Sequence, residues 1–312
     1  MPQQAKKSVG IAVITHRAKQ HLAHCLPPLL NSPLKPRLLV VNSSSNDGTV
    51  EEAKRLGADV LVIPRKEFNH GATRERARKE LATDIAVMMT PDAYALDTSL
   101  IERLITPLLK EQASLAYARQ IPHDNRGFFE SFPRLFNYPD TSHIRGIEDV
   151  EKYGVYTFFC SDTCSAYLNS ALDDIGGFLP VLSAEDAFAA ASLIKKGHKI
   201  AYVAEAVVKH SHNYSLVQEF QRHFDTGYVR KQYSDLLDFG VTDEARGKQY
   251  VKTLFGKTLK TCPWKLPYAA LTIAAKYAGY QAGKRAFNAP LWLKKKLSSQ
   301  DFYWSSAAFL QK

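Results

Sequence analysis

"AVMMTPDAYALD" runs from Ala86 to Asp97 and joins a buried-strand pattern to a carboxylate. The apolar run Ile85–Met89 stops at Thr90, Pro91 and Asp92. Uninterrupted apolar runs of about four to eight residues, bounded by turn residues, are typical of strands that are buried on both faces. The stretch therefore predicts a central strand that delivers Asp92 at its carboxyl end.

Four similar runs occur elsewhere and alternate with helical patterns. They are Val9–Ile14, Leu38–Val41, Val60–Ile63 and Leu115–Arg119. This alternation indicates an α/β fold, with a mostly parallel sheet covered by helices on both faces. The carboxyl ends of parallel strands meet at one edge of the sheet, where ligands bind. Thr15, Asn42 and Asp92 each follow a predicted strand, so we expect them to lie close together at that edge.

Positive charge is concentrated late in the chain. The 312 residues carry a net charge of +10, but Arg246–Lys296 holds 12 Lys and Arg residues and no Asp or Glu. The remainder is nearly neutral. We therefore predict two parts, an α/β domain at 1–235 and a basic, amphipathic helical region at 236–312 that associates with an anionic membrane surface. A basic helical hairpin that packs on the core is the alternative.

Three observations bear on the compartment. The start of the chain, 1–17, lacks the pattern of a signal peptide. The apolar stretch 266–280 is interrupted by Lys276 and is too short to span a bilayer. Four cysteines are too few for a disulfide scaffold of this size, which favours reduced thiols. We expect a cytoplasmic protein that lies on a membrane surface without crossing it.

Asp92 has two interpretations. An aspartate after proline is a common turn former. It is also a suitable ligand for Mg²⁺ or Mn²⁺, because a cation that holds a diphosphate needs only one or two carboxylates; phosphate oxygens and water complete its shell.

Arg74 is the candidate phosphate ligand. It stands in "FNHGATRERARK" (68–79), near the start of a helix predicted over Ala72–Ala82. A helix N-terminus beside a guanidinium group is a favourable anion site. The basic residues that follow it, Arg76, Arg78 and Lys79, are better explained as a solvated helix face.

Glu185 and Asp186 begin the helix predicted in "SAEDAFAAAS" (183–192). Acidic residues in a first turn commonly offset the helix dipole. The functional alternative is a general base. Adjacent side chains on a helix point about 100° apart, so one of the two faces a site. We choose Asp186 as the base, with Glu185 contacting an acceptor or holding the loop.

His210 and His212, in "VVKHSHNYS" (207–215), share one face of a strand-like segment. They are either polar residues near a strand end, or one of them completes a metal shell with Asp92.

These motifs occur together in one order. The set comprises "VGIAVITHR", "VVNSSSNDGT", "EFNHGATR", "MMTPDA", "IGGFLPVLSAED" and "HSHNYS". Their order and spacing resemble family 2 glycosyltransferases with the GT-A (Rossmann-like) fold, over about Val9–Tyr233. "FNHGATR" and "FFCSDTCSAYLNSALDDIGGF" (158–178) are most similar to the bacterial rhamnosyltransferase branch.

The resemblance implies a nucleotide-sugar site. Four residues would bind the base and ribose of the donor, namely Thr15, Asn42, Ser44 and Asp47. Arg74 would contact the donor diphosphate. Asp92 stands where the metal-binding Asp-x-Asp motif of the family ends, and His210 would be a further ligand to Mg²⁺ or Mn²⁺.

The resemblance also implies the reaction. Asp186 would act as base in an inverting transfer of L-rhamnose from dTDP-rhamnose to a saccharide acceptor, in the synthesis of a cell-surface polysaccharide or O-antigen. A membrane-binding tail favours a lipid-linked acceptor at the inner-membrane surface.

Two other functions are alternatives to this one. A sugar-nucleotidyltransferase would have a glycine-rich phosphate loop after the first strand, and "ITHRAKQHL" (14–22) contains no glycine. A nucleic-acid-binding protein would place basic and aromatic residues along a groove. The late basic segment contains both residue types, but the candidate residues at the sheet edge would remain unexplained, so we expect no nucleic-acid partner.

Overall fold

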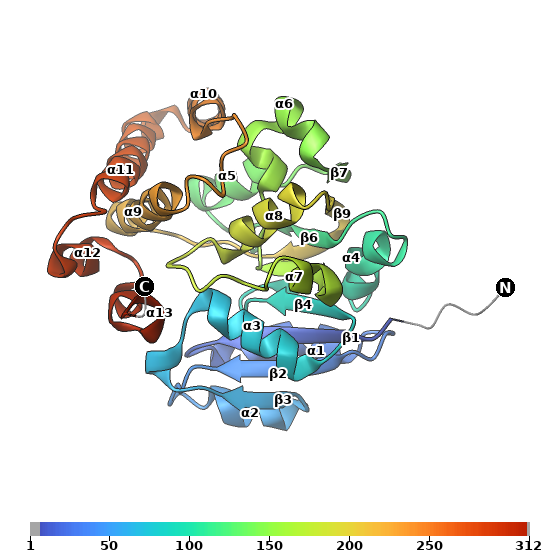
Figure 1. Ribbon diagram of the computed structural model, residues 1–312. Coiled ribbons are helices and arrows are strands. Elements are labelled where there is room, and N and C mark those ends of the chain that lie inside the picture. The colour runs from blue at the N-terminus through green and yellow to red at the C-terminus, as the bar shows by residue number, and fades with distance from the viewer. Residues whose placement is uncertain (1–6, 311–312) are drawn as a thin grey trace.

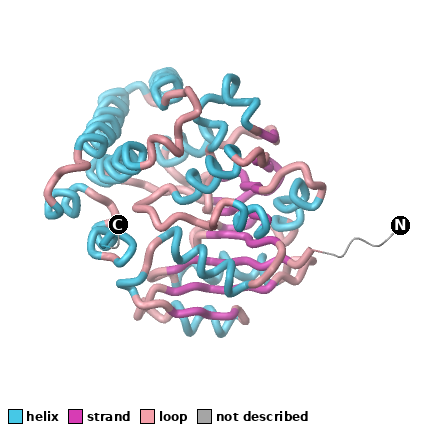
Figure 2. The backbone as a smooth tube through the Cα atoms, in the orientation of Figure 1, coloured by secondary structure: helices cyan, strands magenta, loops and turns pink. Residues whose placement is uncertain are grey.

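The computed structural model describes residues 7–310, and within them the chain forms a nine-stranded sheet (Figures 1 and 2). Residues 1–6 and 311–312 lie outside the described part, so the outer limits of both predicted parts and the first six residues of the segment tested for a signal peptide lie there too. The strands are β1 (Val9–Thr15), β2 (Arg37–Asn42), β3 (Asp59–Val62), β4 (Ile85–Met89), β5 (Tyr94–Ala95), β6 (Leu115–Ile121), β7 (His143–Arg145), β8 (Cys164–Leu168) and β9 (Ile200–Lys209).

Helices connect the strands and extend the chain beyond the sheet. The α-helices are α1 (Lys19–Leu30), α2 (Thr49–Leu56), α3 (His70–Leu81), α4 (Leu100–Leu109), α5 (Phe128–Asn137), α6 (Val150–Tyr153), α7 (Asn169–Asp174), α8 (Glu185–Lys195), α9 (Leu216–Gln232), α10 (Asp243–Thr261), α11 (Leu266–Arg285), α12 (Leu291–Leu297) and α13 (Ala307–Leu310). The 3₁₀-helices are η1 (Arg65–Glu67), η2 (Ile147–Asp149), η3 (Gly154–Phe158), η4 (Pro263–Lys265) and η5 (Asp301–Ser305).

β1 and β4 consist almost wholly of apolar residues because both faces of each strand are buried. Successive side chains of a strand point to opposite faces. Ala12 and Ile14 of β1 enter one core with α3, α7, α8 and α9, whereas Ile11 and Val13 enter a second core with α1, α2 and α4. The prediction of a sheet with helices on both faces is confirmed.

Strand direction changes across the sheet. The order is β3-β2-β1-β4-β8-β6-β9-β5, with β7 beside β9. Neighbours from β3 to β4 are parallel, as are β6 and β9. β8 is antiparallel to both of its neighbours, and β5 and β7 are antiparallel to β9. The sheet is therefore mixed, and the predicted strands β1 to β4 form its continuous parallel part, whereas the predicted strand β6 lies beyond the antiparallel β8.

The predicted edge of the sheet exists. Thr15 and Asn42 are the last residues of neighbouring strands and pair in register, and Asp92 follows the end of β4. In Figure 1 these strands point toward the side of the molecule on which the C-terminal helices lie.

The C-terminal region is helical, as predicted, and α11 packs closely against α9 (Figure 1). Three glycines allow the two backbones to approach. A Cβ atom on Gly279 or Gly283 would collide with a backbone carbonyl of α9, and one on Gly227 of α9 would collide with Tyr280. In the described residues, none of the helices combines the length and the apolar character that a membrane span requires.

The segment after α12 returns to the α/β part. Tyr303 and Trp304 of η5 are buried in the same core as Tyr228 of α9. Arg65 of η1 stacks over the ring of Phe302, with the guanidinium carbon 4.5 Å from the ring centroid. The proposed division at residue 235 stays a prediction.

We expect Gly283→Ala to lower the free energy of unfolding by about 1–3 kcal/mol, because its methyl group would force α11 away from the Phe224 carbonyl. Gly256→Ala is the matched control on α10, where a Cβ meets no atom within 4 Å; it should stabilise the helix by up to about 1 kcal/mol. Urea-induced unfolding measures both. Equal stabilisation by the two substitutions would contradict the packing argument.

Candidate active site

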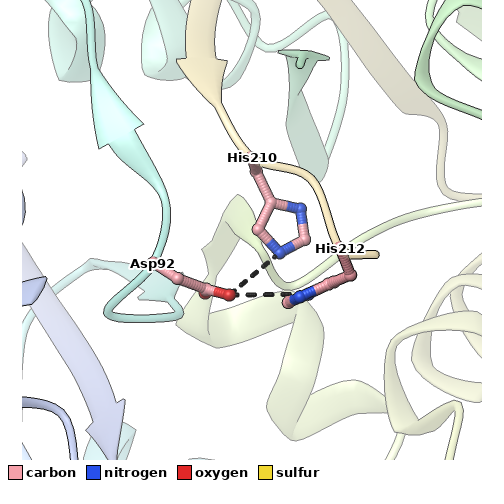
Figure 3. Close-up of side chains that lie close together, drawn as sticks. All are labelled: Asp92, His210 and His212. Atoms are coloured by element: carbon pink, nitrogen blue, oxygen red, sulfur yellow. Dashed lines mark ion pairs between the residues drawn. The ribbon is translucent and has the colours of Figure 1, made fainter. Parts of the chain in front are cut away.

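Asp92, His210 and His212 form a compact cluster where β4 and β9 end (Figure 3). Asp92 Oδ2 lies 3.4 Å from the Nε2 atoms of both histidines. The ligand atoms of all three residues lie within 4.8 Å of one another. Asp92 also sits in a turn, since the amide of Ala93 donates to the Thr90 carbonyl. The turn interpretation of Asp92 is therefore confirmed, and its role as a metal ligand stays a prediction.

Gln120 fixes the proton on His210. Its Oε1 atom, which accepts and does not donate, lies 2.8 Å from His210 Nδ1, and its Nε2 donates to Ser161 Oγ. Burial lowers the pKa of His210, so the ring is neutral near pH 7 and carries its proton on Nδ1. The unprotonated Nε2 then faces the Asp92 carboxylate.

This donor set fits a divalent cation. Burial and the neighbouring His210 lower the pKa of His212 to about 3, so a second neutral imidazole joins the group. The lone pair of His210 Nε2 and the Asp92 carboxylate repel one another unless a cation lies between them. A metal-binding histidine usually donates its other ring N–H to an oxygen, as His210 does to Gln120.

A second cluster surrounds Arg74, which is 4% exposed. Its Nε lies 2.9 Å from Asp162 Oδ2, and its Nη1 lies 2.6 Å from Glu185 Oε1. The structure thus places Arg74 between two buried carboxylates; its predicted contact with a diphosphate stays a prediction. Asp186 is next to Glu185, and its Oδ2 accepts a hydrogen bond from the Asp162 amide at 3.2 Å.

Local backbone features bring the helix starts together. Asn69 caps α3 by accepting from the Ala72 amide, and it donates to the Val181 carbonyl ahead of α8. Gly71 lies against the Leu179 carbonyl, where a Cβ atom would collide. Ala184 is the N-cap residue of α8 and has φ at +63°. This left-handed conformation is unfavourable for alanine, so the surrounding structure must hold it in place.

The acids of this cluster differ in charge state. Burial, with repulsion from Glu185 and Asp162, raises the pKa of Asp186 to about 8. Burial also disfavours ionised Glu185, but Arg74 outweighs it and the pKa of Glu185 is lowered. Burial raises the pKa of Asp162, against the attraction of Arg74. At the start of α8, Glu185 is thus an anion near pH 7, whereas Asp186 mostly carries its proton.

One loop joins the two clusters. Ser161 accepts from Gln120, the partner of His210, and the next residue, Asp162, binds Asp186 through its amide. Two adjacent residues of this loop, Ser161 and Asp162, therefore connect the metal-type cluster, which contains His210, to the acidic cluster, which contains Asp186.

The predicted nucleotide residues are placed at the ends of β1 and β2. Asn42 donates to Thr15 Oγ1 at 3.1 Å, and both side chains are buried. Ser44 donates to the Ile63 carbonyl. Burial disfavours ionised Asp47, but hydrogen bonds, chiefly from Thr49 and Ser45, lower its pKa to about 2. These contacts shape the loop, and their role toward a nucleotide stays a prediction.

Several residues of the site lacked a clear sequence signal. His212 has such a signal, because it shares the strand face of His210, but the family resemblance points to His210 alone. Asp162, Ser161 and Gln120 had none, since each acts through a partner distant in sequence.

The fold is the one expected of a glycosyltransferase. The sequence pattern of Glycosyl transferase family 2 matches residues 10–176, just over half of the chain. The chain therefore belongs to glycosyl transferase family 2 and is a glycosyltransferase, as the resemblance predicted.

Two curated relatives extend the match over almost the whole chain. The O-antigen chain rhamnosyltransferase RfbN of Salmonella typhimurium is 34% identical, covering 96% of this chain and 97% of the relative. The O-antigen chain rhamnosyltransferase WbaN of Salmonella anatum is 35% identical, with 92% and 91% covered.

Solved structures confirm the predicted fold class. The mannosyltransferase PcManGT of Pyrobaculum calidifontis, in complex with GDP-Man and Mn²⁺, has a TM-score of 0.55 at 16% identity, covering 98% of this chain and 87% of that one. TarS 1–349 of S. aureus, in complex with UDP-GlcNAc, has a TM-score of 0.53 at 12% identity, covering 90% and 91%.

We expect Asp186→Asn to change how stability depends on pH. The folded protein retains a proton on Asp186 up to about pH 8, whereas the unfolded chain releases it near 3.8, so the free energy of unfolding falls as pH rises between these values. The variant lacks this loss and should exceed the parent by roughly 1–5 kcal/mol at about pH 8.5, and by little at about pH 4. Urea unfolding across this range measures the difference, and the exposed Asp140→Asn is the control. A gap that is constant with pH would refute the assignment.

Proposed function

We propose that this glycosyltransferase transfers L-rhamnose from dTDP-rhamnose to a saccharide acceptor, with inversion at the anomeric carbon, in the synthesis of a bacterial surface polysaccharide. Two relatives named O-antigen chain rhamnosyltransferases, 34% and 35% identical over nearly their full lengths, support the sugar and the acceptor class. A dTDP-linked donor agrees with the sequence resemblance of the segments around Arg74 and Asp162.

The observation that carries the proposal is a pair of clusters that are linked through one loop. Asp92, His210 and His212 offer ligands for a cation, and Asp186 offers a base. Ser161 and Asp162 link the two sets. A transfer from a nucleoside diphosphate needs both functions within the length of one sugar ring.

The reaction follows from these positions. The acceptor hydroxyl oxygen forms a bond to the anomeric carbon, while the bond from that carbon to the diphosphate breaks and its electron pair leaves with the diphosphate. Asp186, in its ionised form, accepts the hydroxyl proton, a contribution of roughly 10²–10⁴ in rate. A bound divalent cation would neutralise charge that develops on the leaving diphosphate. Attack from the face opposite the leaving group inverts the anomeric centre.

We propose Mn²⁺ in preference to Mg²⁺. Two of the three ligands are imidazole nitrogens, and Mg²⁺ strongly prefers oxygen ligands in an octahedral shell. Asp92 supplies the carboxylate, and donor phosphate oxygens would fill further positions.

We also propose a lipid-linked acceptor at the cytoplasmic face of the inner membrane, and no nucleic-acid partner. The surface along α10 to α12 supports this. Trp264 and Trp292, before and after α11, are 74% and 66% exposed, and Leu259 and Leu271 are also exposed. This stretch contains the acid-free basic segment, and basic surfaces with exposed aromatic residues bind anionic bilayers.

The proposed activity is tested with purified protein, Mn²⁺ and a panel of dTDP-, UDP- and GDP-sugars, with a short-chain lipid-linked saccharide as acceptor. We expect product from dTDP-rhamnose and loss of at least about 10²-fold in kcat with Asp186→Asn. Transfer of another sugar only would overturn the donor assignment, and full activity of the variant would overturn the base.

The metal site is tested without a donor. We expect Asp92→Asn and His212→Ala each to weaken Mn²⁺ binding by about tenfold or more, because each removes a ligand, as measured by electron paramagnetic resonance of the free ion. Asp97→Asn, at an exposed carboxylate paired with Arg103, should leave the affinity unchanged. Wild-type affinity in the Asp92→Asn variant would refute the site.

The membrane surface is tested by flotation with vesicles that contain about one-third anionic lipid. We expect Trp264→Ser with Trp292→Ser to shift the protein from the floating to the soluble fraction, because the indole rings no longer insert at the interface. Leu109→Ser, an exposed apolar residue on α4, is the control. Flotation that is equal in the two variants would contradict the assignment.

A further inference from the structure

Three carboxylates share one guanidinium in the buried cluster. Asp162 and Glu185 form ion pairs with Arg74, whereas Asp186, beside them, has no ion pair with any residue in 7–310. Burial lowers the pKa of the nearby His70, so that ring adds no positive charge near pH 7. With all three acids ionised, the cluster would carry an excess of negative charge in a place from which water is largely excluded.

Asp162 is held more firmly than its neighbours. Its Oδ1 atom accepts hydrogen bonds from the hydroxyl groups of Ser165 at 2.5 Å and Tyr167 at 2.7 Å, while Arg74 lies against Oδ2. These contacts fix the backbone of Asp162. The amide N–H of Asp162 donates a hydrogen bond to Asp186 Oδ2, and Asp186 Oδ1 accepts one from the Ala187 amide.

We propose that Arg74 and Asp162 are positioning residues that orient Asp186 and set its affinity for the proton of the acceptor hydroxyl. The proposal rests on the proposed function, in which Asp186 is the base. Arg74 acts as a counter-charge, and Asp162 acts in two ways, by its amide and by its negative charge.

The two residues act in opposite directions. The positive charge of Arg74 favours ionised Asp186, whereas the negative charge of Asp162 disfavours it. Removing Arg74 leaves three carboxylates without a counter-charge, so Asp186 should bind its proton more tightly. Neutralising Asp162 removes repulsion and strengthens the effect of Arg74, so Asp186 should bind its proton less tightly.

Other titratable groups around Asp186 do not obscure this effect. They are Tyr138, which follows α5, Cys160, in the loop before β8, and Tyr167, on β8. Burial raises the pKa of each of these groups above its usual value, so they are neutral where Asp186 titrates. Glu185 is the remaining charged neighbour; it is paired with Arg74 in the parent, and in Arg74→Gln its unpaired charge adds to the repulsion of ionised Asp186.

The test is the dependence of kcat/KM on pH, which reports ionisation in the free enzyme. For the parent we expect activity to rise with pH through an apparent pKa near 8, because the ionised base is the active form. Asp162→Asn should move this rising limb of the pH profile to lower pH by about one unit, and Arg74→Gln should move it to higher pH by about one unit. The double variant should lie between the two.

Controls separate this effect from a structural one. Asp162→Glu keeps the charge and should return the limb toward that of the parent. Lys79→Gln lies on the same helix as Arg74 but pairs with Glu75, and it should not move the limb. If Arg74→Gln does not fold, the comparison of Asn and Glu at position 162 decides the question.

Three outcomes would overturn the inference. The limb stays in place in both variants; it moves in the same direction in both; or Arg74→Gln raises the KM for the donor with no change in the limb, which would make Arg74 a diphosphate ligand. The inactivity expected of Asp186→Asn is scored separately. If that variant is fully active, the proposed base fails; if it is inactive and the limbs do not move, only the positioning role fails.

Discussion

The site depends on a single buried positive charge. Arg74 belongs to α3, and its two partners, Asp162 and Glu185, come from the loop before β8 and from the start of α8. A charge that is removed from water is costly unless ionic partners surround it. These three segments must therefore lie against one another in the folded protein, and their meeting places Asp186 beside the loop that leads to the metal-type cluster.

The N-terminal half of the sheet could be predicted from the sequence because its strands are buried on both faces. Such strands leave uninterrupted apolar runs, and β4, with Ile85–Met89, is the clearest of them. β8 escaped prediction because it contains Ser165 and Tyr167, whose hydroxyl groups bind Asp162. Its antiparallel direction is also absent from any local pattern, since apolar spacing reports burial and not the partner of a strand.

The candidate site could also be predicted only in part from the sequence. Asp92, His210 and Asp186 could be selected because each stands at the boundary of a recognisable element. The position of Arg74 near a helix start was also readable, but its carboxylate partners were not. Gln120 and Asp162 matter through contacts with residues that are distant in sequence, and a pattern within a short window carries no information about such contacts.

The return of the chain after α12 has a consequence for folding kinetics. Trp304 is fully buried against Tyr228, Ser299 binds Asp225 through its amide at 2.9 Å, and Phe302 lies under Arg65. Arg65 follows β3, so this last contact joins residues that are very far apart in sequence. Contacts of wide sequence separation form slowly, because a long loop must close before they are made. The core around α9 is therefore expected to close late, after the strands β1 to β4 have paired.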